Sequence, residues 1–240
     1  MKNLILKSAA ILFLTTLFIG NGYAQRVKGN GKLIQKTRNV SSFNGVGVSG
    51  SFDVFLVEGN EGKIELSVEE NLEQYLVTEV KNGKLKIRWE KGININTSRN
   101  TEVTVHFKKL NSVALSGSGD IISRDRITTD NLDIAVAGSG DIELEFSAQS
   151  AQAAVSGSGD IKLEGTSTEF EAAVAGSGDI KAYDLQTDKA ELKISGSGTI
   201  QCSVEKELVA RISGSGDIKY KGNPRIEDIK VSGSGSVSSY

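Results

Sequence analysis

The sequence predicts an all-β fold, a parallel β-helix or solenoid whose coils, called rungs here, each take about 18–21 residues. The first observation is a motif, Gly-Ser-Gly-Asp-Ile or a close variant, that recurs through residues 111–240. Its seven copies begin at Gly117, Gly138, Gly157, Gly176, Gly196, Gly214 and Gly233. A fixed period of about 20 residues is typical of solenoids, in which each repeat buries its apolar face against its neighbours.

The second observation is a side-chain alternation within each repeat. From Leu132 to Phe146, large apolar residues and glycines occupy the even positions, whereas polar residues and alanines occupy the odd ones. A period of two indicates a strand with one buried face, and a helical repeat would need apolar spacings of three and four. Both glycines of each motif fall on the inward parity, so we expect the chain to bend there with no room for a side chain.

Residues 25–110 lack the short period but are still strand-like. Val46 to Leu56 keep the parity of the repeat and predict a first rung. The rest of the segment predicts an irregular cap over the N-terminal end of the solenoid, because an open end needs a cover. Within it, Asn82-Gly83 between two alternating runs predicts a hairpin, and Glu69 to Leu76 predict one short helix.

The first 24 residues have the layout of a secretory signal peptide. Lys2 and Lys7 precede an apolar run from Ala9 to Ile19, and the small residues Gly22 and Ala24 follow it. The apolar run is short for a membrane span. We therefore expect residues 1–24 to be removed, leaving an exported chain with no membrane span that stays in the periplasm, reaches the outer surface or is secreted.

The composition of the remaining chain limits the classes of binding partner that we expect. Removing Lys2 and Lys7 from 28 basic residues leaves 26 against 30 acidic ones, a net charge of −4. This weakly acidic surface argues against nucleic acid as the main partner. The single cysteine, Cys202, excludes an internal disulfide, so stability must come from packing and backbone hydrogen bonds.

Stacked rungs would align the polar residues of the motif into two outward columns, one of serines and one mainly of aspartates. These are the candidate binding residues: Ser118, Asp120, Ser139, Asp141, Ser158, Asp160, Ser177, Asp179, Ser215 and Asp217. Carboxylates at the spacing of about 4.8 Å between strands repel one another unless something neutralises them, and calcium is one candidate ligand. The other interpretation is structural, with each aspartate accepting backbone hydrogen bonds at the corner. Thr199 and Ser236, which replace aspartate, favour the structural interpretation.

Several ordered motifs resemble a known family. The Gly-Ser-Gly-Asp-Ile repeats, the segments VSGSFDVFL and ENLEQYLVTEVKNGKLKI, and the tripeptide Gly92-Ile93-Asn94 are similar to the putative auto-transporter adhesin, head GIN domain family of exported bacterial proteins. The resemblance covers about residues 40–235. It implies a β-helix similar to the pectin lyases but without a shared catalytic set. The function that it implies is cell adhesion. Because the sequence shows a long, polar, repetitive face and no catalytic constellation, we expect a non-enzymatic module whose partner is a glycan or a surface protein.

Two further possibilities stay open at this point. A carbohydrate-active enzyme of the pectate-lyase kind would use the cluster of Asp120, Arg124, Asp125 and Arg126, which otherwise forms an ordinary solvated connection between rungs. The last rung, around Val231 to Val237, would leave an unpaired strand edge, and this edge predicts a homo-oligomer through the C-terminal rung.

Overall fold

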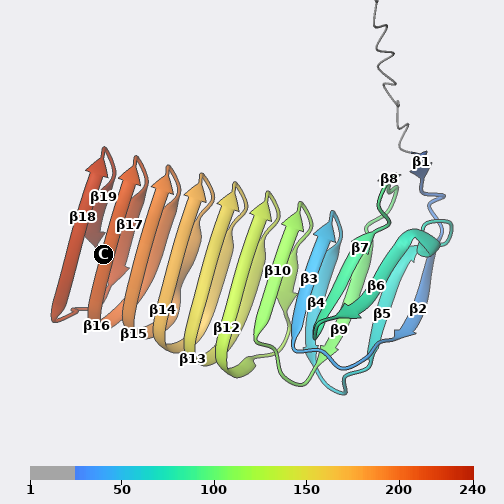
Figure 1. Cartoon of the computed structure of the whole chain (residues 1–240), viewed down its shortest axis with the longest axis horizontal. Helices are drawn as coiled ribbons and strands as arrows, with labels where there is room; N and C mark the ends of the chain where they lie inside the picture. Colours follow the sequence, from blue (N-terminus) through green and yellow to red (C-terminus); the bar gives the residue numbers. More distant parts are fainter. Residues whose placement is uncertain (1–24) are drawn as a thin grey trace, which may run out of the picture.

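The protein is a flattened solenoid of about seven turns, seen from the side in Figure 1. The computed structural model describes residues 25–240, so the expected signal peptide lies outside the described residues. Long strands wind around the repeat region and stack side by side: β12 (Ile127–Gly138), β13 (Ile142–Gly157), β14 (Ile161–Gly176), β15 (Ile180–Gly196) and β16 (Thr199–Gly214). All their pairings are parallel. The predicted all-β solenoid is therefore confirmed.

The rungs stack with equivalent residues directly opposite one another. Gly138 pairs with Gly157, which pairs with Gly176, and the register continues through Gly196 to Gly214. Inward residues such as Val155 and Ile161 are 2% exposed or less and form one continuous apolar column. The side-chain alternation read from the sequence therefore assigns the core correctly.

Glycine is required at the motif because the next backbone lies too close for a Cβ atom. A Cβ atom on Gly157 would lie 2.4 Å from the carbonyl oxygen of Gly138, and one on Gly159 would lie 2.1 Å from that of Gly140. Gly157 also has a φ of +129°, which L side chains rarely adopt. The Gly138 oxygen accepts hydrogen bonds from the N–H groups of Ser158 and Gly159, at 2.9 and 3.0 Å. Backbone hydrogen bonds therefore link each corner to the corner of the preceding rung.

The first rung is formed by β3 (Gly45–Gly50) and β4 (Asp53–Glu58), as predicted. These strands pair in parallel with the next rung, β10 (Ser112–Gly117) and β11 (Ile121–Ser123). The excursion between the two rungs contains β5 (Lys63–Glu69), β6 (Leu76–Lys81), β7 (Lys84–Trp89), β8 (Ile93–Asn96) and β9 (Glu102–Phe107). Strands β6 and β7 form the predicted hairpin, with Asn82 and Gly83 at φ values of 53° and 73°.

The short helix expected near Glu69 to Leu76 is not confirmed. The structure has only one turn of 3-10 helix there, η1 (Glu73–Tyr75), and no α-helix within residues 25–240. Leu72 and Leu76 are buried at a spacing that suits a helix, but Leu76 already starts β6, which pairs with β7. Strand pairing on both sides leaves room for a single turn, so tertiary contacts override the local pattern.

The two ends of the solenoid differ. At the N-terminal end the sheets are extended by antiparallel strands: β2 (Leu33–Asn39) pairs with β5, β5 with β9, and β6 with β7. A separate pair, β1 (Gln25–Lys28) and β8, lies beyond them (Figure 1). The C-terminal end consists of β17 (Asp217–Lys221), β18 (Ile226–Gly233) and β19 (Ser236–Ser239). No helix within the described residues is long and apolar enough to cross a membrane.

Candidate functional site

The predicted aspartate column exists, and its carboxylates bind the backbone of the following rung. Asp120 Oδ1 accepts a hydrogen bond from the N–H of Asp141 at 3.1 Å, and Asp141 Oδ1 accepts one from the N–H of Asp160 at 2.8 Å. The same bond recurs from Asp160 to the N–H of Asp179, at 2.9 Å, and from Asp179 to that of Thr199, at 2.8 Å. These contacts are the ones that the structural interpretation of the column expects.

The substitutions in the column fit this role. Where Thr199 replaces aspartate, the N–H of Asp217 instead donates to the carbonyl oxygen of Gly198, at 3.2 Å. Asp217 Oδ1 in turn accepts hydrogen bonds from both the hydroxyl and the N–H of Ser236, at 2.7 and 2.9 Å. These two bonds hold the pKa of Asp217 below its usual value.

The column is one residue longer than the sequence motif shows. Asp53, in the first rung, lies opposite Asp120 because Val54 pairs with Ile121. Partial burial, followed by the nearby charge of Asp120, raises the pKa of Asp53. Within the described residues, no three acidic, histidine or cysteine side chains converge as a metal site. Among the residues described, one basic side chain forms an ion pair with the column. It is Lys181, whose Nζ lies 2.6 Å from Asp160 Oδ2. Calcium binding along the column stays the alternative interpretation.

The predicted serine column lies at the exposed corner of the rungs. Ser118, Ser139 and Ser158 are exposed, and so are their equivalents Ser177 and Ser215. Their hydroxyls make no hydrogen bond with other groups in residues 25–240, whereas their backbone N–H groups hold the corner. The hydroxyls therefore stay available to an external ligand.

The residues of the proposed lyase-like cluster do not converge. Asp120 is committed to the N–H of Asp141, and the Arg124 guanidinium stacks 4.4 Å above the ring of Phe55. Asp125 Oδ2 accepts the N–H of Glu58 at 2.9 Å. The fourth residue, Arg126, pairs with Glu145 on the neighbouring rung, at 2.5 Å. This pattern is that of a connection between rungs and not of a paired acid and base.

A different surface stands out on the sheet formed by β3, β10, β12 to β16 and β18. Two neighbouring columns of outward side chains on this sheet consist only of glycine, alanine and serine over five strands. We call them the small-residue lane: Gly47, Ala114, Ala135, Ala154 and Ala173 in one column, and Ser49, Ser116, Ala137, Ser156 and Ala175 in the other. The lane runs along the solenoid axis, across the strands.

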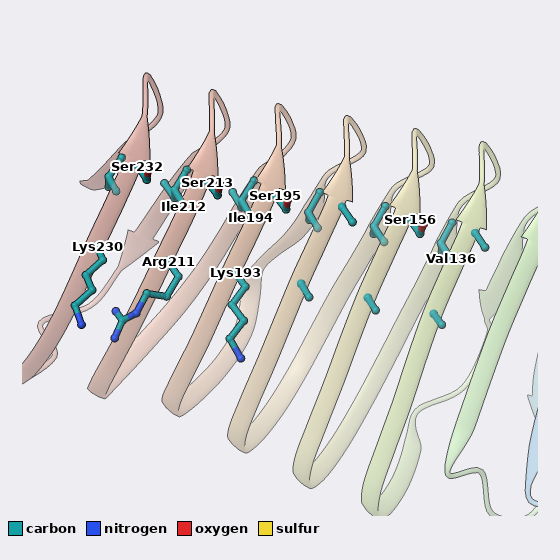
Figure 2. A pocket seen from close by; sticks show the side chains of 18 residues that line it. Val136, Ser156, Lys193, Ile194, Ser195, Arg211, Ile212, Ser213, Lys230 and Ser232 are labelled. Carbon is teal, nitrogen blue, oxygen red and sulfur yellow. The ribbon is translucent and has the colours of Figure 1, made fainter.

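The lane is hollowed into shallow grooves. One groove, of about 570 Å³, follows β12 to β16 and β18 and has a mostly apolar lining (Figure 2). A second, of about 580 Å³, crosses β7, β3, β10 and β12. Short side chains create these grooves, because the flanking column on the same sheet carries longer acidic and amide side chains such as Asp133, Gln152 and Glu171.

At both ends of the lane, the first column of outward positions continues with basic side chains. The first column continues into Lys193, Arg211 and Lys230, which extend from adjacent strands in Figure 2. At its other end it reaches Lys86 on β7, opposite Gly47. From Lys86 to Lys193 the column crosses six strand steps, which is about 29 Å at the usual strand spacing.

The basic residues differ in their partners. Lys193 Nζ lies 2.7 Å from Glu191 and 3.3 Å from Glu171, and Arg211 pairs with Asp228. Lys86 and Lys230 form no ion pair with any residue that the structure describes. The lane is therefore an uncharged strip of small side chains that lies between two basic residues, Lys86 and Lys193, about 29 Å apart.

Comparison with known proteins identifies the family of the chain. Residues 42–224 match the model of the putative auto-transporter adhesin, head GIN domain family. The chain belongs to this family. The resemblance seen in its motifs is thereby confirmed. No curated protein matches the chain.

Solved structures with a similar fold come from Bacteroides and Parabacteroides species. A putative adhesin from Bacteroides fragilis is 25% identical with a TM-score of 0.84, over 89% of this chain and 100% of its own. A putative lipid binding protein from Parabacteroides distasonis is 30% identical with a TM-score of 0.74, over 90% of this chain and 100% of its own. A putative adhesin from Parabacteroides merdae is 26% identical with a TM-score of 0.71, covering 90% and 99%. Family and neighbours together support a role in adhesion.

Proposed function

We propose that this protein is an exported, non-enzymatic adhesion module that contacts a glycan or a surface protein through the small-residue lane. The observation that carries the proposal is the register of the lane, in which glycine, alanine and serine follow one another over five strands between cationic ends. Family membership supports the adhesive role.

The lane suits binding for an energetic reason. Alanine and glycine lose no side-chain rotamer freedom when a partner covers them, and the parallel ladder already fixes the backbone. Ordering costs at the interface are therefore small, which leaves more of the contact energy for affinity. In each rung the exposed serine lies two residues beyond the lane, as Ser139 does after Ala137, so its hydroxyl can donate to a bound sugar or peptide.

A matched pair of variants tests the lane. Ala154→Trp places a large side chain in the groove, whereas Gln149→Trp places the same side chain on an exposed site of the same strand, β13. Beads coated with each protein would be tested against a glycan array, matrix proteins and bacterial cells. We expect wild type and Gln149→Trp to bind one of them and Ala154→Trp to lose at least tenfold in affinity. Equal binding by both variants would show that the contact surface lies outside the lane.

The non-enzymatic part has its own assay. We expect a panel of acidic and neutral polysaccharides to keep their chain length during incubation with the protein. New reducing or unsaturated ends, lost in Arg124→Ala, would instead support the lyase-like cluster. Export would be checked by fractionating cells that express the full chain, with the N-terminus of the exported protein sequenced to locate cleavage.

One observation favours a second candidate function, the binding of an anionic amphiphile. The groove along β12 to β16 and β18 is mostly apolar, and Lys193, Arg211 and Lys230 line it on the last three of these strands. An acyl chain spans about 15 Å, half the hydrocarbon thickness of a bilayer, and this length equals about three strand steps. An acyl chain could then lie over Ala173 to Ala135 with its acidic head at the basic end. Fluorescent fatty acid would bind in a titration, and Ala154→Trp would abolish binding.

A further inference from the structure

The C-terminal end of the solenoid exposes residues that would be core in any other rung. Ile229 and Val231 lie opposite Ala210 and Ile212 in the register. They are 39% and 43% exposed, whereas their counterparts are 0% and 3% exposed. Strand β18 pairs with β16 on one side, and β19 pairs with β17. Within residues 25–240, nothing covers their outer edges.

We propose that a second copy of this chain docks on this edge, with β18 antiparallel to the partner's β18 around a two-fold axis at Ile229. An unpaired strand edge is a template for another strand. Head-to-tail stacking would need a rung-like edge at the other end, but the antiparallel strands β2, β5 and β6 occupy that end. Two C-terminal edges can meet only head to head, and this arrangement is isologous and closes as a dimer.

Charge selects the register of the pair. Residues that lie opposite each other in an antiparallel pair point to the same face of the sheet. The inward face of one copy therefore continues that of the other only if inward residues lie opposite inward residues. This requires the two-fold axis to lie at a residue and not between two residues. An axis at Asp228 places two carboxylates opposite each other, and one at Lys230 places two ammonium groups together. An axis at Ile229 places Asp228 opposite the partner's Lys230, twice. Opposite charges across strands stabilise and like charges destabilise.

The central apolar contact agrees with this register. Ile229 packs against the partner's Ile229, so the side chain that the free end exposes becomes part of a shared core. Val231 lies opposite the partner's Glu227, and the Glu227 carboxylate already accepts the hydroxyl of Tyr220, at 3.0 Å. In the flattened coil the two sheets face each other, so the same axis also brings β19 opposite the partner's β19 (Figure 1). Both sheets then continue from one copy into the other.

Single cysteines test the axis directly. In a Cys202→Ala background, Ile229→Cys places its thiol opposite itself, and opposite Cα atoms about 4.5–5.5 Å apart are within disulfide reach. The control Ile226→Cys lies three residues from the axis, so the two thiols are about 20 Å apart. Under mild oxidation we expect a covalent dimer from Ile229→Cys and monomer from Ile226→Cys. Cross-linking of both variants alike, or of Ile226→Cys alone, would overturn the register.

Charge reversal provides a second test that needs no cysteine. Lys230→Glu and Asp228→Lys each place like charges across the axis in a homodimer, but a mixture of the two variants restores two opposite-charge pairs. Sedimentation should show wild type at twice the monomer mass, each variant as monomer, and their equimolar mixture as dimer. Circular dichroism spectra that match the wild-type spectrum would confirm the folds of both variants. A monomeric wild type at high concentration, or a mixture that stays monomeric beside a dimeric wild type, would overturn the proposal.

Discussion

The carboxylate of Asp141 accepts a hydrogen bond from the backbone N–H of Asp160, 2.8 Å away and one rung further along the solenoid. Asp160 repeats the contact with Asp179, at 2.9 Å. The bonds lie at the corner, where the parallel strand ladder is interrupted between Gly157 and Ile161. A side chain thus satisfies a backbone donor that the ladder leaves without a partner.

Removing this acceptor should destabilise the solenoid. We expect Asp141→Ala to lower the free energy of unfolding by about 1 kcal/mol, since one exposed hydrogen bond is lost. Asp141→Asn should cost less, because its amide oxygen can still accept the bond. Urea unfolding monitored by circular dichroism measures both. Ser139→Ala is the control, because the exposed Ser139 hydroxyl bonds to no described residue. A cost for Ser139→Ala equal to that for Asp141→Ala would contradict the role of the carboxylate.

Metal removal distinguishes the two interpretations of the aspartate column. The carboxylate oxygens of Asp120, Asp141 and Asp160 already accept backbone N–H groups. We therefore expect thermal melting to be unchanged when calcium is replaced by EDTA at constant ionic strength. A melting temperature that rises with calcium and falls with EDTA, but does not respond to magnesium, would establish a calcium site along the column.

The corner glycines should tolerate no side chain. A Cβ atom on Gly159 would lie 2.1 Å from the carbonyl oxygen of Gly140, and that backbone cannot move without disturbing the stack. We expect Gly159→Ala to cost about 3 kcal/mol of stability, as overpacking of a rigid site does. Gly47→Ala is the matched control, since its nearest contact would be the Leu85 oxygen at 4.0 Å. Denaturant unfolding of the two variants compares them, and similar losses would refute the steric explanation.

The sequence could predict the solenoid because its signals are local. Alternation from Leu132 to Phe146 assigns the inward face, and the spacing of the glycine pairs sets the length of a rung. The helix expected near Glu73 is not confirmed, for the opposite reason. Its apolar spacing suits a helix, but pairing of β6 with β7, which involves a different part of the chain, decides the conformation.

The small-residue lane was missed because no single repeat displays it. Ala135, Ala154 and Ala173 are unremarkable outward residues until stacking brings them together. A signal was nevertheless present, since each lies three residues before the first glycine of its motif. Lys193 and Lys230 occupy that position in later rungs. Comparing the repeats position by position would therefore have found the lane and its basic end.

Asp53 should make stability depend on pH. Burial and then the charge of Asp120 raise its pKa, so the folded state favours the neutral carboxyl. This contribution is fully present below the unfolded pKa of about 3.9 and is lost as the pH rises through the folded pKa. We expect Asp53→Asn to melt at a higher temperature than wild type at neutral pH and at the same temperature at about pH 3. An equal difference at both pH values would contradict titration of Asp53 as the cause.

Glu69 should hold two loops at the N-terminal end. Its carboxylate is 0% exposed and accepts N–H groups from Gly31, from Ser98 at 2.8 Å and from Arg99 at 3.4 Å. Because Glu69→Ala removes three part-buried hydrogen bonds to a charged acceptor, we expect a cost of about 2 kcal/mol. The released loops should be cut faster by trypsin, at Arg99 first. The neighbouring Glu70→Ala removes only an exposed ion pair with Lys32 and should leave cleavage unchanged. Equal protection of Arg99 in both variants would show that other contacts hold the loops.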